Sequence, residues 1–91
     1  MNKRLTLKIF GAVHGIGYRY SSQNEAKKRG FTGYVMNLDD GSVELVAEGQ
    51  EKDLKAFINW CYNGVGPAQV LNIDQSWSKA TGEFSDFMIR S

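Results

Sequence analysis

Cysteine, histidine and proline are scarce in this sequence, with one of each among 91 residues. The lone Cys61 leaves no intrachain disulfide, so the sequence excludes a disulfide-stabilised scaffold and favours a reducing compartment. One cysteine and one histidine, His14, are too few for an ordinary zinc site. We therefore expect a cytoplasmic protein whose fold depends on an ordinary hydrophobic core.

Long apolar runs and an excess of one charge are also lacking. No stretch approaches the roughly 20 apolar residues of a membrane helix, and Lys8 interrupts the apolar run that follows the basic N-terminus, as no signal peptide would. Eleven basic and ten acidic residues leave a net charge of +1, whereas nucleic-acid binders usually carry a larger positive field. The composition predicts neither a membrane nor a nucleic-acid partner, and leaves room for a local anion site.

The composition that is present is that of an ordinary globular domain. Hydrophobic residues make up 42% of the chain and charged residues 23%, close to the average for folded proteins. The length corresponds to one domain, over residues 1–91. No repeat, linker or low-complexity segment interrupts it.

Hydrophobic periodicity predicts seven elements along the chain. Apolar residues at every second position, such as Leu5, Leu7 and Ile9, indicate strands, and apolar residues at spacings of three and four indicate the second helix. The strands are expected over 4–10, 32–37, 42–47, 68–77 and 84–90, and the helices over 20–29 and 51–62. This order is the split βαβ pattern. It predicts an α+β, ferredoxin-like sandwich with two helices on one face of an antiparallel sheet.

The two predicted helices differ in character. The second carries an apolar stripe that includes Cys61, which makes a core role the simpler interpretation of that thiol. The first has few core candidates, Tyr18 and Ala26 with Ser22 between them. We therefore expect weak packing of the first helix and modest stability.

A glycine-rich loop, GAVHGIGYR over residues 11–19, joins the first strand to the first helix. Glycines let backbone N–H groups approach a ligand, and these groups with the helix N-terminus form an anion cradle. Arg19 stands at the helix start, where its planar guanidinium suits two phosphate oxygens. The Walker and dinucleotide-binding patterns are absent, and glycine spacing alone favours a tight turn beside a solvated arginine over an anion site.

A second segment, GYVMNLDDGSVELVAEG over residues 33–49, adds to this pattern. The two segments together resemble the acylphosphatase family over nearly the whole chain, because they carry both family signatures in the right order and spacing. The first signature is matched by Gly11, Val13, Gly15, Gly17, Tyr18 and Arg19. The second is matched by Gly33, Tyr34, Val35, Asn37, Gly41, Val43 and Gly49.

The resemblance implies an enzyme that hydrolyses the carboxyl–phosphate bond of small acyl phosphates to a carboxylate and inorganic phosphate. Arg19 and the backbone N–H groups of residues 14–19 would hold the phosphoryl group, and Asn37 would orient the attacking water. The phosphate-binding residues would thus be His14, Gly15, Ile16, Gly17, Tyr18 and Arg19. No metal or other cofactor and no partner besides the substrate are implied, and we expect a monomer. No segment reads as a dedicated acyl-group pocket, so broad acyl specificity is expected.

Three residues have simpler alternatives to a functional role. His14 stands where many family members carry glutamine, and a loop residue hydrogen-bonded to backbone is the plainer interpretation. Asp39 and Asp40 could bind a cation, but the Asp-Gly signature of a hairpin turn explains them better.

Three other functions stay open at this level. Residues 29–35 partly resemble an RNA-recognition motif, with one residue inserted and Asn37 near the place of an aromatic. A domain of the same fold could bind ligands without catalysis. The acylphosphatase-like domain of hydrogenase-maturation proteins suggests carbamoyl phosphate handling, although a free-standing hydrolase is favoured for a chain of this length.

Overall fold

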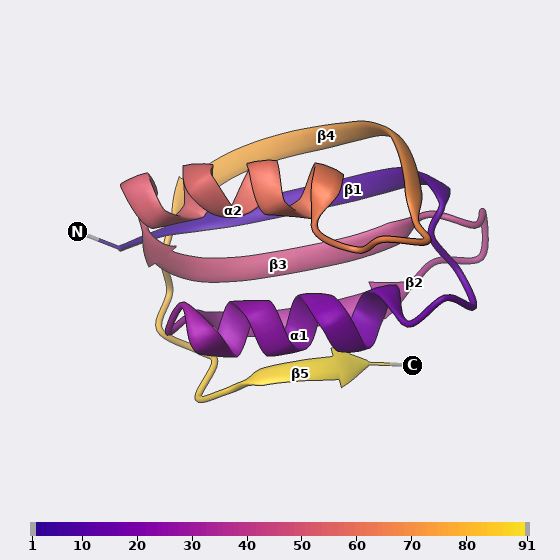
Figure 1. Cartoon of the computed structure of the whole chain (residues 1–91). Coiled ribbons are helices and arrows are strands. Elements are labelled where there is room, and N and C mark those ends of the chain that lie inside the picture. The colour runs from indigo at the N-terminus through magenta and orange to yellow at the C-terminus, as the bar shows by residue number, and fades with distance from the viewer. Residues whose placement is uncertain (1, 91) are drawn as a thin grey trace.

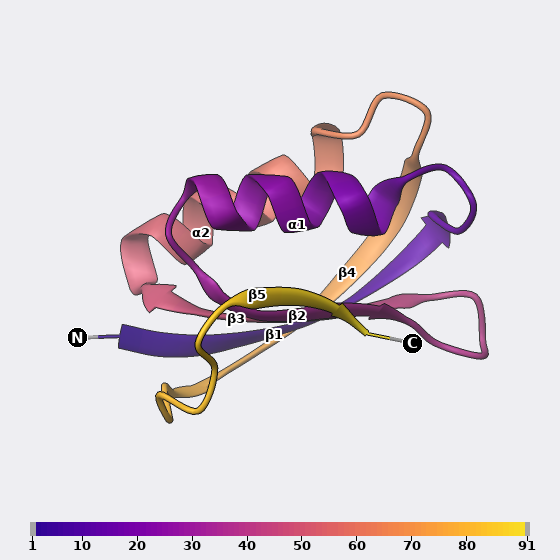
Figure 2. The ribbon, with the colours of Figure 1, turned by 90° about the horizontal axis from the view of Figure 1, so that it is seen from below.

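A computed structural model describes residues 2–90 of the chain. Its elements follow the order β1 (Asn2–Ala12), α1 (Tyr18–Lys28), β2 (Thr32–Asn37), β3 (Val43–Gln50), α2 (Glu51–Asn63), β4 (Gln69–Lys79) and β5 (Phe87–Arg90). The strands form one sheet in the order β4-β1-β3-β2-β5. Both helices cover the same face of this sheet (Figures 1 and 2). The predicted ferredoxin-like α+β sandwich is confirmed.

The sheet is not wholly antiparallel, because β5 pairs in parallel with β2. The other three strand pairs are antiparallel, as predicted. The chain leaves β4 at one edge of the sheet and crosses to the opposite edge, so no tight hairpin dictates the direction of β5. The strand also begins at Phe87 rather than at residue 84, since the preceding residues belong to the crossing segment.

Other strand boundaries also differ from the predicted ones by a few residues, because strand pairing sets them. β1 and β4 are longer than predicted because they pair with each other along almost their whole length. α1 begins at Tyr18 and β3 continues to Gln50, directly before α2. Cross-strand partners, rather than local alternation, decide where these strands end.

The core lies between the sheet and the two helices. α1 contributes only three buried residues, Tyr18, Ser22 and Ala26, as its weak apolar face predicted. The Tyr18 hydroxyl donates a 2.7 Å hydrogen bond to the Cys61 carbonyl, which ties α1 to α2. Cys61 is fully buried, which confirms its core role, and burial raises the pKa of its thiol to about 12. Such a thiol is unreactive at neutral pH.

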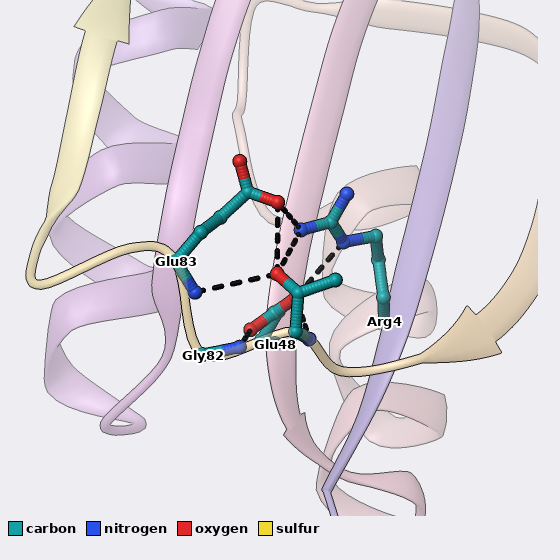
Figure 3. A network of polar contacts seen from close by, with 5 residues as sticks. Arg4, Glu48, Gly82 and Glu83 are labelled. Carbon is teal, nitrogen blue, oxygen red and sulfur yellow. Dashed lines mark hydrogen bonds and ion pairs between the residues drawn. The ribbon is translucent and has the colours of Figure 1, made fainter.

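The face of the sheet away from the helices carries a polar network (Figure 3). Glu48 of β3 is only 4% exposed. Its carboxylate accepts hydrogen bonds from Arg4 Nε at 2.8 Å, from the Thr81 N–H at 3.0 Å and from the Gly82 N–H at 3.1 Å. Arg4 also pairs with Glu83. The network therefore attaches the segment that leads to β5 to the centre of the sheet.

None of the helices within residues 2–90 has the length and apolar character needed to cross a membrane.

Candidate active site

A pocket of about 320 Å³ opens at the N-terminus of α1. It gathers residues from the loop after β1, the first turn of α1 and the C-terminal parts of β2 and β5. The lining residues are Val13, Gly15, Gly17, Tyr18, Arg19, Tyr20, Asn37 and Ile89.

The glycine loop turns into α1 through left-handed backbone conformations. Gly15 has a φ of 73° and Gly17 a φ of 81°, which side-chain-bearing residues adopt only with strain. Gly17 is the N-cap of α1, and no side chain caps the helix there. The first turn of α1 also carries no acidic residue. The free N–H groups and the positive end of the helix dipole therefore favour an anion at this point.

Arg19 is the positive charge of this pocket. It lies one residue into α1 and is partly buried. Among residues 2–90, no carboxylate forms an ion pair with it. Its guanidinium thus keeps its fork of donors for a ligand, and the fork matches a phosphoryl group well.

Asn37 brings an unpartnered polar atom to the same pocket. It is the last residue of β2, and its Oδ1 is buried without a hydrogen-bond partner among the described residues. A buried acceptor left in this state costs about 1–3 kcal/mol, and such exceptions call for a functional explanation. A bound molecule with an O–H or N–H donor would satisfy this oxygen.

The structure brings together most of the predicted site residues, but two stand apart from the pocket lining. The His14 ring donates from Nε2 to the Ser42 carbonyl at 2.8 Å, which agrees with its interpretation as a loop residue bonded to backbone. Ile16 packs against the hydrophobic core. Neither residue is among those lining the pocket, and both side chains contact other parts of the fold.

Tyr18 lines the pocket although its side chain belongs to the core. The ring is 1% exposed and its hydroxyl is engaged with α2. The side chain therefore anchors the start of α1, and with it the position of Arg19.

Three lining residues were not among the predicted site residues, namely Val13, Tyr20 and Ile89. Tyr20 follows Arg19 directly, so its place in the chain was a usable signal. Ile89 could not be found from local pattern, because its position depends on β5 lying beside β2.

The structure explains Asp40 as a turn residue. Asp40 Oδ1 accepts a hydrogen bond from the Ser42 N–H at 3.0 Å, and its Oδ2 lies 3.0 Å from Lys8 Nζ. This confirms the turn interpretation of Asp40. Among residues 2–90, no three His, Cys, Asp or Glu side chains gather as a metal site would require.

Comparison with known proteins identifies the family. The family model described as Acylphosphatase matches residues 5–89. An acylphosphatase of Caldanaerobacter subterraneus subsp. tengcongensis is 44% identical over 89 residues, which cover 98% of this chain and 99% of that protein. The chain belongs to the acylphosphatase family. This membership confirms both the resemblance noted in the sequence and the expectation of a hydrolase that acts on acid anhydrides.

Solved structures of acylphosphatases share the fold in detail. The crystal structure of acylphosphatase from Bacillus subtilis superposes with a TM-score of 0.93 at 36% identity, covering 98% of this chain and 99% of that one. Full-length HypF in its phosphate- and nucleotide-bound form has a TM-score of 0.87 at 28% identity. The match covers 100% of this chain and only 12% of HypF. The acylphosphatase fold thus occurs both as a small protein and as part of a longer one.

Proposed function

We propose that this chain hydrolyses acyl phosphates by direct attack of water on phosphorus, without a metal ion. Family membership supports acyl phosphate hydrolysis, and the pocket supports the roles of individual residues. In this proposal Arg19 and the backbone N–H groups of residues 14–19 hold the phosphoryl group. Asn37 orients the water.

The observation that carries the proposal is the buried Oδ1 of Asn37, which has no hydrogen-bond partner among residues 2–90 and lies in the same pocket as Arg19. An amide oxygen accepts a hydrogen bond from water but is no useful base. Asn37 therefore positions the water without removing its proton. The water oxygen bonds to phosphorus as the bond from phosphorus to the acyl oxygen breaks, and the proton passes to a phosphate oxygen.

The leaving group explains why so few residues suffice. A carboxylic acid has a pKa near 4, so the carboxylate leaves as a stable anion at neutral pH and needs no general acid. Phosphoryl transfer then depends mainly on positioning and on stabilising the charge of the equatorial oxygens. Arg19 and the loop N–H groups supply that stabilisation.

The test is benzoyl phosphate hydrolysis in excess chelator, with the wild-type protein and Asn37→Ala. We expect fast wild-type turnover, and a kcat lowered about 100-fold in Asn37→Ala, comparable to the loss of one transition-state hydrogen bond in other enzymes. The affinity for inorganic phosphate, measured by calorimetry, should change less than about twofold, because Asn37 acts on the water.

The control variant is Asn59→Ala, which removes an exposed asparagine from α2 and should leave kcat unchanged. Near-normal turnover of Asn37→Ala would disprove the water-orienting role. Loss of wild-type activity in chelator would disprove the metal-independent mechanism.

The buried position of Phe31 weakens the RNA-binding alternative. Phe31 is 4% exposed and packs edge-on against Phe57 in the core, where it cannot stack on a base. A monomeric state, a cytoplasmic location and the lack of a nucleic-acid partner stay predictions.

A further inference from the structure

The pocket is larger than a phosphoryl group requires. Its 320 Å³ is several times the volume of a phosphoryl group, which displaces only a few water molecules at about 30 Å³ each. The volume is at the lower end of the range for small-molecule sites. Space is therefore left beside the phosphoryl position for part of an acyl group.

Apolar side chains from separate parts of the chain line this space. Val13 comes from the loop after β1, Tyr20 from the first turn of α1 and Ile89 from β5. Tyr20 is 69% exposed, and within residues 2–90 its ring stacks on no other aromatic ring. A large, mostly exposed ring that lines a pocket is available to a ligand.

The charges of the lining residues also favour a neutral, apolar acyl group. Of the lining residues, Arg19 carries the single formal charge, and no carboxylate is among them. The phosphoryl group engages Arg19, so an acyl group with a second negative charge would find no cation in the lining. A neutral acyl group would bury its apolar surface against Tyr20 and Ile89 instead.

We infer that Tyr20, together with Ile89, forms an acyl-group subsite that makes this enzyme prefer aromatic and other apolar acyl phosphates. The inference rests on the proposed acyl phosphate hydrolysis and sharpens it. It departs from the broad acyl specificity expected from sequence. Tyr20 is a specificity-determining residue here, and the chemistry at phosphorus stays with Arg19 and Asn37.

The first test compares kcat/KM for benzoyl phosphate and acetyl phosphate. Tyr20→Ala should lower the value for benzoyl phosphate about fivefold to twentyfold, the range of an aromatic contact with the burial that accompanies it. Acetyl phosphate should change less than about twofold, because its methyl group is too small to reach the ring. Tyr20→Phe should retain the preference, since the ring and not the hydroxyl makes the contact.

Leu71→Ala is the matched control, because Leu71 is 81% exposed on β4 and does not line the pocket. It should leave both substrates unchanged. An equal loss for both substrates in Tyr20→Ala would mean that Tyr20 only positions Arg19, and no loss for either would mean that the ring contacts nothing. Both outcomes overturn the subsite.

A binding test separates this inference from the hydrolysis on which it rests. The probes are 2-oxo-2-phenylethylphosphonate and 2-oxopropylphosphonate, in which a methylene replaces the scissile oxygen. The wild-type protein should bind the phenyl compound about fivefold to twentyfold more tightly, and Tyr20→Ala should lose that difference. A difference without hydrolysis of any acyl phosphate would support the subsite and overturn the proposed function. Hydrolysis without a difference, or binding of neither phosphonate, would overturn the subsite.

Discussion

Two arginine-centred polar sites lie on opposite sides of the sheet and are built in opposite ways. On the face of the sheet away from the helices, the buried Glu48 accepts hydrogen bonds from Arg4 and from backbone N–H groups of the segment that leads to β5. On the helix side, Arg19 has no carboxylate partner within residues 2–90, and the nearby Asn37 Oδ1 has no donor.

The difference shows that polar groups in a small fold can contribute either to stability or to ligand binding. A saturated network stabilises the native state, because every buried group exchanges its water for a protein partner. An unsaturated pair costs stability and keeps its hydrogen-bonding capacity for a ligand. Substitutions in the two sites should therefore separate activity from stability.

The largest effect is expected at Arg19. Arg19→Ala should lower kcat/KM for benzoyl phosphate about 1,000-fold or more, as for arginines that stabilise transferring phosphoryl groups elsewhere. The free energy of unfolding, from urea denaturation, should change by less than about 0.5 kcal/mol, because Arg19 is only partly buried and belongs to no ion pair among residues 2–90.

Arg19→Lys distinguishes the geometry of this charge from the charge itself. It should recover little activity, since a lysine cannot offer the planar pair of donors. Full rescue by lysine would show that a point charge is sufficient, and a large loss of stability in Arg19→Ala would remove the contrast with Arg4.

The second effect is expected at Glu48 and should fall on stability. Glu48→Gln should lower the free energy of unfolding by about 2 kcal/mol, because charge-assisted hydrogen bonds to Arg4 and to two backbone N–H groups are weakened. The kcat/KM of the folded variant should stay within about twofold of wild type. Glu51→Gln is the control, since Glu51 forms an exposed i,i+4 pair with Lys55, worth at most about 0.5 kcal/mol.

Lowering the pH should destabilise the protein in the same way as Glu48→Gln, because it protonates the Glu48 carboxylate. Burial by itself raises the pKa of Glu48, but hydrogen bonds from Thr81, Arg4 and Gly82 outweigh it and hold the pKa below its usual value of about 4.5. A carboxyl group whose pKa is lower in the folded state than in the unfolded state stabilises the fold at pH values above the unfolded-state pKa. This stabilisation is lost as the pH falls through the folded-state pKa. Urea titrations below pH 4.5 should therefore show wild type losing more stability than Glu48→Gln. Parallel curves would contradict this linkage.

The smallest effect is expected at His14, which connects the glycine loop to the turn after β2. His14→Gln should change kcat/KM at neutral pH by less than about twofold, because a glutamine amide can also donate to the Ser42 carbonyl. His14→Ala removes that hydrogen bond and should lower kcat/KM severalfold by loosening the loop. A collapse of activity in His14→Gln would show that the imidazole has a role of its own.

Local patterns predicted much of this fold and of the candidate site. The alternation around Leu7 and the apolar stripe of α2 identify a strand and a helix, because backbone periodicity sets which side chains share a face. The glycine loop and Arg19 also follow from local sequence, since a strand, a left-handed turn and a helix N-terminus form within ten residues. The resemblance then directed attention to Asn37.

The sequence by itself thus determined the order of the elements, the loop that begins α1 and the family. Only the tertiary structure decided that β5 runs parallel to β2, that Glu48 is buried by a segment more than 30 residues away, and that Tyr20 and Ile89 share a pocket with Arg19. These features depend on which strands become neighbours in the sheet. Strand neighbours are selected by the packing of the whole core, so no local period of the chain encodes them.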